Sequence, residues 1–225
     1  MTKNFWTRAL GICLIGAPLL TLVSAIVCPP IKQDEAAQLA VIAEHPARYY
    51  AFTVFTWAGI ALLVPALIGL MYMVRERAPA WGNVGGTLAI AGSLIAIGDA
   101  ASQLVIWQMA ARGADRAEMA ALLKRFDDTL GSSLVFSIGG LAFLAGSVIL
   151  GIGLYRSRTV PAWVAAGFVA GAFLNIVGFG SSSVAILVAS SVILLVALGW
   201  IGWRMLADPD RAGLPSGALS GAQAG

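Results

Sequence analysis

Long apolar stretches, separated by short polar ones, make up most of the pattern of hydrophobic and polar positions along the chain. Six stretches are long enough to cross about 30 Å of hydrocarbon at about 1.5 Å per helical residue. They lie near residues 9–27, 51–74, 84–109, 133–155, 164–180 and 184–203. The pattern predicts an all-α, polytopic membrane protein with one six-helix transmembrane domain over residues 1–206. Residues 207–225, rich in Gly, Ala and Ser, predict a disordered cytoplasmic tail.

Two shorter segments between these stretches have the spacing of amphipathic helices. The segment 114–128 places four apolar residues at i, i+3, i+4 and i+7, on one face of a helix. These residues are Met119, Leu122, Leu123 and Phe126. The segment 34–45 is a weaker case, with Leu39 and Ile42 as its apolar positions. We expect both helices to lie on the outer surface, either in the membrane interface or as caps over a cavity.

An internal repeat runs in parallel through the middle of the chain. The stretch 54–63 is echoed by 135–144, and each is followed by two arginines and then by the triplet Pro-Ala-Trp. The triplets begin at Pro79 and Pro161 and end at Trp81 and Trp163. Trp6 opens the first apolar stretch in the same way, which favours a membrane helix there over a cleavable signal peptide. We therefore expect three helical hairpins of one pattern, each opened by Trp and closed by Arg.

The distribution of charge predicts the orientation of these hairpins. Hydrophobic residues make up 59% of the chain and charged residues 11%, with a mean hydropathy of +0.87, well outside the globular range. Most Lys and Arg residues fall on one side of the six stretches, so by the positive-inside rule both termini are cytoplasmic. The expected location is the bacterial cytoplasmic (inner) membrane, with the lipid bilayer as partner. The net charge of +3 follows from this asymmetry and gives no reason to expect nucleic-acid binding.

Small and aromatic residues predict how the helices are anchored and packed. The two Trp residues of the repeated triplets fall at headgroup depth, and the two Pro residues fall near helix starts, where a missing N–H is harmless. Gly167 and Gly171 form a GxxxG face that allows close helix approach. The spacing does not say whether this contact lies within the chain or between chains. A homo-oligomer or a membrane partner protein therefore stays open.

Asp99 lies deep within a membrane stretch, a few residues outward of the middle of the third. An ionised carboxylate there costs at least about 2.5–3.5 kcal/mol, so Asp99 is expected to face the protein interior and to be protonated or to meet donors. Ser102 and Gln103 share its helix face, and Ser190 and Ser191 reach similar depth from the sixth stretch. These five are the candidate ligand-binding residues. A structural interpretation competes, in which a protonated Asp99 holds two helices together as polar glue.

The sequence offers no constellation for catalysis, a cofactor or a metal. Acid–base and nucleophilic catalysis both need a positioned partner group, and Asp99 has none within a membrane stretch. His45 is the only histidine, and Cys13 and Cys28 are the only cysteines, so a zinc or haem site is not expected. We name no catalytic or metal-binding residue, and the expectation leans away from an enzyme without excluding one.

The stretch Leu154-Tyr155-Arg156-Ser157, followed after two residues by Val160-Pro161, resembles the signature of a large family of bacterial membrane proteins. That family is known only as a domain of unknown function. The resemblance implies a six-helix topology over most of the chain. It implies no activity, so no catalytic residue is carried over from it.

Three hypotheses of function follow. The leading one is a non-enzymatic membrane protein that binds or moves a small or lipidic ligand through a cavity near Asp99. The second is an intramembrane enzyme acting on a lipid-soluble substrate, and the third is a structural or interaction subunit of a membrane complex. A polar pocket containing Asp99 favours the first two, whereas a dry, closed bundle favours the third.

Overall fold

The computed structural model describes residues 3–110 and 115–208, and these form eight helices and no strand. Six helices are long and apolar enough to cross a membrane: α1 (Lys3–Val27), α3 (Pro46–Arg75), α4 (Pro79–Met109), α6 (Leu130–Arg156), α7 (Ala162–Gly180) and α8 (Val184–Ala207). The other two, α2 (Glu35–Glu44) and α5 (Arg116–Asp127), occupy the two segments with amphipathic spacing. The prediction of an all-α protein with six membrane-length helices is confirmed. The predicted tail lies outside the described residues from position 209 onward.

The longest helices extend past the apolar stretches that the hydropathy pattern delimits. At about 1.5 Å per residue, the 30 residues of α3 span about 45 Å, more than the hydrocarbon thickness of about 30 Å. Both α3 and α4 have Pro in their first turn, at Pro46 and Pro79, where the fixed φ favours a helix start. Helix length is therefore set by backbone hydrogen bonding and by the proline starts rather than by hydropathy alone.

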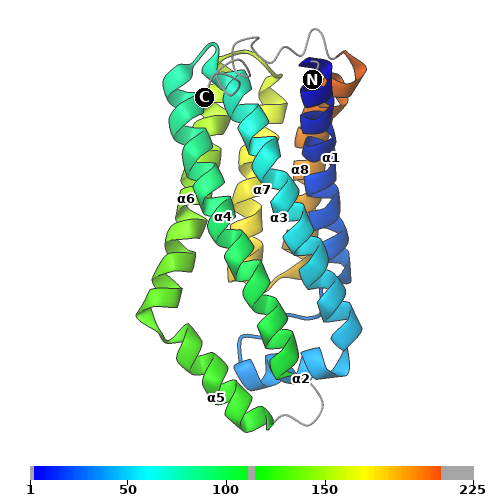
Figure 1. Ribbon diagram of the computed structural model, residues 1–225, viewed down its shortest axis with the longest axis vertical. Helices are drawn as coiled ribbons and strands as arrows, with labels where there is room; N and C mark the ends of the chain where they lie inside the picture. Colours follow the sequence, from blue (N-terminus) through cyan, green and yellow to red (C-terminus); the bar gives the residue numbers. More distant parts are fainter. Residues whose placement is uncertain (1–2, 111–114, 209–225) are drawn as a thin grey trace, which may run out of the picture.

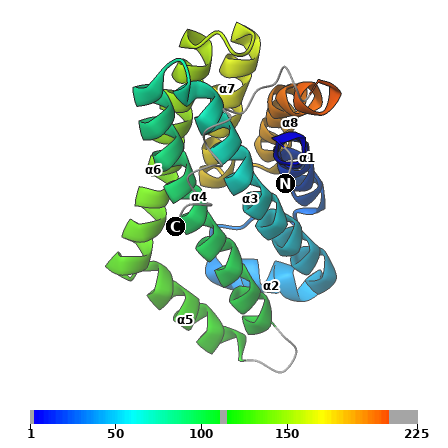
Figure 2. The ribbon, with the colours of Figure 1, turned by 45° about the horizontal axis from the view of Figure 1, so that its top comes forward.

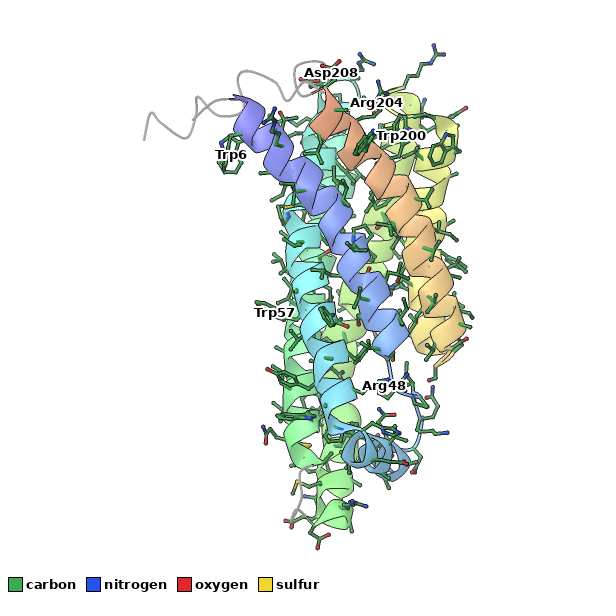
Figure 3. The ribbon with its side chains drawn as sticks, turned by 90° about the vertical axis from the view of Figure 1, so that its right-hand side faces the viewer. Trp6, Arg48, Trp57, Trp200, Arg204 and Asp208 are labelled. Atoms are coloured by element: carbon green, nitrogen blue, oxygen red, sulfur yellow. The ribbon has the colours of Figure 1, made fainter. Side chains whose placement is uncertain are left out.

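The six long helices form a closed ring in which each one packs against two neighbours. Around the ring the order is α1, α3, α4, α6, α7 and α8, and α8 closes on α1 (Figure 1). One end of the ring, here called the terminal end, holds Trp6, Trp200, Arg204 and Asp208 (Figure 3). The opposite end, here called the capped end, holds α2 and α5 (Figures 1 and 2). The assignment of the terminal end to the cytoplasm remains a prediction.

Buried apolar side chains gather in two clusters, one in each half of the ring. The terminal cluster takes large residues from five helices, and its most deeply buried members include Leu14, Leu70, Leu154, Phe168 and Ile201. The capped-end cluster is smaller and joins α2 to the first turns of α3 and the last turn of α4. Its buried members are Cys28, Leu39, Ile42, Tyr49, Phe52 and Ala110. The terminal half is therefore filled by large side chains, whereas the opposite half is sealed mainly at its end.

The four apolar positions of α5 do not share one contact surface. Leu123 is buried and Met119 packs against the capped-end cluster, as amphipathic spacing predicts. Leu122 and Phe126 are 46% and 44% exposed. The reason is geometric: α5 contacts α2, α4 and α6 along a narrow strip, so half of its apolar face is left outside.

Close helix contacts depend on small residues. A Cβ added at Gly85 would lie 2.5 Å from the Leu150 amide nitrogen, and one at Gly146 would collide with the backbone of Ala89, so α4 and α6 touch almost backbone to backbone. The GxxxG face of α7 meets α8, because Gly171 lies against Leu194 and Gly167 against Ala197. In this structure the GxxxG contact is thus made within the chain.

The connections at the terminal end are tied together by arginines and aromatic rings. The Arg156 guanidinium lies over the Trp81 ring at 5.4 Å, and Trp81 packs partly into the terminal cluster rather than standing free at the interface. Trp163 is half exposed and meets Trp200 edge to face, with 5.9 Å between ring centroids. Pro161 is the residue immediately before α7, and Arg77 Nη1 donates to the Ser157 carbonyl at 3.2 Å.

Candidate functional site

A cavity of about 950 Å³ lies between the two buried clusters, in the capped half of the ring. All six long helices line it, together with Gln38 of α2 and with Cys28, Pro29 and Ile31 of the segment that joins α1 to α2. Its volume is near the upper end of the range of about 300–1,000 Å³ that small-molecule sites occupy in proteins. The lining is mainly apolar, with a few polar side chains, as is usual for such sites.

Small residues create this space. The face of α4 toward the cavity carries Gly92, Ser93, Ala96 and Ala100, whose spacing places them on one side of a helix. At corresponding places in the terminal cluster, neighbouring helices carry Leu and Phe. Because protein interiors are otherwise closely packed, small side chains along this face of α4 leave space that larger ones would fill.

Asp99 lines the cavity, and its polar neighbours come from α3 and α4. The Tyr49 hydroxyl donates to Gln103 Oε1, and Tyr49 lies within electrostatic range of the Asp99 carboxyl. Tyr49 is 3% exposed and is held by the capped-end cluster. Since Gln103 Oε1 accepts the Tyr49 hydroxyl, the Gln103 Nε2 hydrogens are the amide donors that remain for a ligand. Three polar side chains of different chemistry thus meet at one wall of the cavity.

A second polar group lies across the cavity, between α1 and α3. The hydroxyls of Ser24 and Thr56 are 2.6 Å apart, and Ser24 Oγ also donates to the Phe52 carbonyl at 3.1 Å. Asn175 lines the cavity from α7. The side-chain amide of Asn175 makes no hydrogen bond to any residue of 3–110 or 115–208. It is therefore a further polar group to which a ligand can hydrogen-bond.

The five residues proposed from sequence separate into two groups. Asp99, Gln103 and Ser191 line the cavity. Ser102 does not line it, because its hydroxyl turns back to the Asp99 carbonyl at 2.7 Å along α4. Ser190 lies outside it as well, buried between α7 and α8 with its hydroxyl on the Gly171 carbonyl at 3.0 Å. Ser190 therefore joins two helices rather than facing a ligand.

Tyr49 and Thr56 line the cavity, although the sequence pattern does not single them out as site residues. Tyr49 precedes a second tyrosine at the end of an apolar stretch, a position that is typical of the aromatic belt at a membrane interface. The structure places it inside instead, because α3 begins earlier than its apolar stretch and turns Tyr49 toward α4. The i+7 spacing from Tyr49 to Thr56 was the available signal that both share one helix face.

Charge in the cavity is of one sign. Among the lining residues of the described chain Asp99 is the only acid, and no Lys, Arg or His lines the cavity. Arg48 lies toward the capped end (Figure 3), where it donates to the Val27 and Cys28 carbonyls at 2.8 and 2.9 Å. The described residues hold no group of three potential metal ligands. The site therefore suits an apolar molecule that carries a hydrogen-bond donor or a positive charge.

Cys28 lies at the capped rim of the cavity, just beyond α1. Its thiol is 2% exposed and donates to the Pro29 carbonyl at 3.3 Å. Burial raises the pKa of the Cys28 thiol to about 11, and the positive charge of Arg48 opposes this only in part. Cys28 is therefore a neutral side chain at physiological pH.

A ring of six apolar, membrane-length helices around a partly polar cavity defines a multi-pass integral membrane protein with an internal site. Residues 6–206 match the family described as a domain of unknown function, DUF4386, and the chain belongs to that family. Membership of an uncharacterised family, which the Leu-Tyr-Arg-Ser stretch suggested, is thereby confirmed. Searches of curated proteins and of solved structures found no match to the chain.

Proposed function

We propose that this protein binds a small, mainly apolar ligand in the membrane, with the ligand's polar group held at Asp99. The observation that carries this proposal is the cavity of about 950 Å³ in which Asp99 is the only carboxyl group among the described lining residues. Gln103, Tyr49 and Asn175 supply further hydrogen-bonding groups around the same space.

The position of Asp99 argues against a purely structural role. Polar glue joins two helices at a dry contact, as Ser190 does between α7 and α8. Asp99 interacts with neighbouring side chains such as Tyr49, but it also faces a cavity large enough for a ligand, where an ionised acid destabilises the protein as long as the cavity is empty. Residues that lower stability in this way are typical of functional sites.

Binding is favoured over transport and over catalysis. The terminal cluster fills the half of the ring toward the other face, so the cavity is a pocket in one half of the protein. Catalysis would need a second group to exchange protons with Asp99, and the described lining holds no other acid and no histidine.

The charge of the lining defines the ligand class. A cationic or proton-donating head gains a charge-assisted hydrogen bond to Asp99, whereas an anionic head would face the carboxyl with no basic residue among the described lining residues. A long-chain primary amine has both required parts, an apolar tail and a cationic donor.

The test uses a fluorescent long-chain amine and the intact protein in phosphatidylcholine nanodiscs. The probe carries dansyl at the end of a twelve-carbon amine chain, and energy transfer from tryptophan reports its binding. We expect saturable binding that dodecylamine competes away and dodecanoate does not. Asp99→Asn should weaken binding by about 10- to 100-fold, since a hydrogen bond to a charged group is worth about 1.5–3 kcal/mol.

Asp128→Asn is the matched control, because Asp128 is an exposed acid outside the cavity. It should bind the probe as the wild type does. Equal binding by Asp99→Asn and the wild type would contradict the proposal. A marked fall in the unfolding temperature of Asp99→Asn, with unchanged probe binding, would establish the polar-glue role instead.

The proposal includes the location of the protein. We propose that it lies in a bacterial cytoplasmic membrane, with both termini in the cytoplasm and the lipid bilayer as its main partner. The support is that Arg75, Arg156 and Arg204 all lie at the terminal end. The internal use of the Gly171 contact leaves the outer faces of the ring as the surfaces for a homo-oligomer or another membrane protein.

A further inference from the structure

Four residues that line the cavity are also exposed on the outside of the protein, and all four lie on α6 or α7. They are Ser137 and Leu141 on α6 and Phe179 and Gly180 on α7. The other lining residues, from every helix of the ring, are buried or half-buried. A residue that faces both a cavity and the outside lies at an opening, so the cavity opens between these two helices.

The packing of α6 and α7 explains the opening. In the terminal half the two helices touch, since a Cβ at Gly151 of α6 would collide with Val169 of α7. In the capped half, a Cβ at Gly140 on α6 or at Gly180 on α7 would have no heavy atom within 4 Å. The two helices are the least extensively packed neighbours of the ring, and α6 runs outward toward α5 at the capped end (Figures 1 and 2). Their contact ends where the cavity begins.

The opening faces lipid rather than water. On α6 the exposed residues beside Ser137 and Leu141 are apolar, and they include Leu134, Val135 and Ile138. Leu141 lies seven residues inside the start of the membrane-length segment Leu134–Arg156, which is about 10 Å along a helix. The α6 side chains at the opening therefore stand within the hydrocarbon of one leaflet, whereas Phe179 and Gly180 form the other flank at the end of the membrane-length segment Ala162–Gly180.

We infer that the ligand enters the cavity sideways from the bilayer, between the capped halves of α6 and α7. This inference rests on the proposed function, and it fixes the ligand class as single-chain amphiphiles dissolved in the membrane. The cationic or donor head reaches Asp99 and Gln103 in the interior. The chain lies along Leu141 and Phe179 in the opening, where its end stays in contact with lipid.

Blocking the opening reversibly tests this route. In a Cys13→Ala, Cys28→Ala background that binds the dansyl-amine probe, Gly140→Cys is modified with methanethiosulfonate reagents of increasing size. The probe's binding and release in phosphatidylcholine nanodiscs are followed by stopped-flow energy transfer. We expect the bulkiest reagent to slow both rates by at least about tenfold with little change in affinity, since an obstacle on the route acts on both directions. A reducing agent should restore both rates, and Gly180→Cys should behave in the same way from the other flank.

Gly98→Cys is the matched control. A Cβ at Gly98 also has no heavy atom within 4 Å, and Gly98 is exposed on α4 next to Asp99, but it does not line the cavity. Its modification should leave both rates unchanged. Equal rates of probe binding and release in modified Gly140→Cys and modified Gly98→Cys would overturn the inference. A modified Gly140→Cys that loses affinity only because it releases the probe faster would overturn it too. Absence of saturable probe binding in the unmodified wild type would instead overturn the proposed function together with the inference.

Discussion

A carboxyl group inside a membrane protein is stabilised by polar neighbours. The helix geometry places such side chains beside Asp99 on the same wall of the cavity. Gln103 follows one turn later on α4, and Tyr49 reaches the pair from α3. Neighbouring residues can still differ completely in role, because a helix turns about 100° per residue. Ser191 faces the cavity, while Ser190 beside it bonds to the backbone of α7.

Cys28 gives a prediction of pH dependence at this scale. Burial raises the pKa of the Cys28 thiol from its ordinary value of 9.0 to about 11, so the folded state holds the proton more tightly than the unfolded state between about pH 9 and 11. Stability should therefore be unaffected below pH 9 and should fall as the pH rises from 9 to 11. The measurement is the unfolding temperature at pH 7, 9 and 10.5.

Cys28→Ala is the control for that series. It should lose less stability between pH 9 and 10.5 than the wild type does. In a Cys13→Ala background, iodoacetamide should label Cys28 slowly at pH 8, because the thiolate is the reactive form and the side chain is buried. Rapid labelling at pH 8 would show that Cys28 is neither buried nor of raised pKa.

At the scale of elements, α6 has two halves with different neighbours. Its terminal half is clamped against α4 by Gly146 and against α7 by Gly151. Its capped half keeps the α4 contact at Gly139 but leaves α7. The same helix thus closes the ring at one end and opens it at the other.

Gly146→Leu should destabilise the protein. A Cβ at this position collides with the Ala89 backbone of α4, so the helices must separate, and overpacking of this kind costs about 1–3 kcal/mol. The unfolding free energy in detergent measures the effect. Gly98→Leu is the comparison, because it adds the same side chain to a membrane helix where no heavy atom lies within 4 Å. Equal stability of the two variants would show that α4 and α6 are not in close contact.

At the scale of the whole molecule, the ring has a filled half and a hollow half. Arg75, Arg156 and Arg204 stand at the filled end, and the caps α2 and α5 lie at the hollow end. The positive-inside rule predicts that the filled end faces the cytoplasm, and in that orientation the cavity opens toward the outer leaflet.

Topology reporters test this orientation. Green fluorescent protein fused after Arg77 or Asp208 should fluoresce, because these positions lie at the terminal end and it folds in the cytoplasm. Alkaline phosphatase fused after Asp115, before α5, should be active because it folds outside the cytoplasm. The reverse pattern would invert the protein and place the cavity in the inner leaflet.

The number and type of the long helices could be predicted from the sequence. The physical reason is that the free energy of transferring a segment into lipid is a sum over its own residues. Each of the six helices can therefore be recognised without knowledge of its neighbours. Asp99 could be singled out for the same reason, since an acid is costly at that depth whatever surrounds it. The amphipathic helices α2 and α5 can be predicted from the spacing of apolar residues as well. The spacing does not predict that Leu123 of α5 is buried while Leu122 and Phe126 are exposed.

The site itself was decided by the tertiary structure. The parallel repeat in the sequence suggests equal packing of α3 with α4 and of α6 with α7, yet only the first pair packs extensively. Whether Ser190 or Ser191 faces inward, and whether Tyr49 joins Gln103, depends on rotations and lengths of helices that local hydropathy does not specify. The sequence by itself determined a six-helix membrane protein with one acid deep in a membrane stretch, because both depend on transfer of single segments into lipid. Only the tertiary structure decided that the acid faces a cavity open between α6 and α7, because a cavity depends on where two helices part.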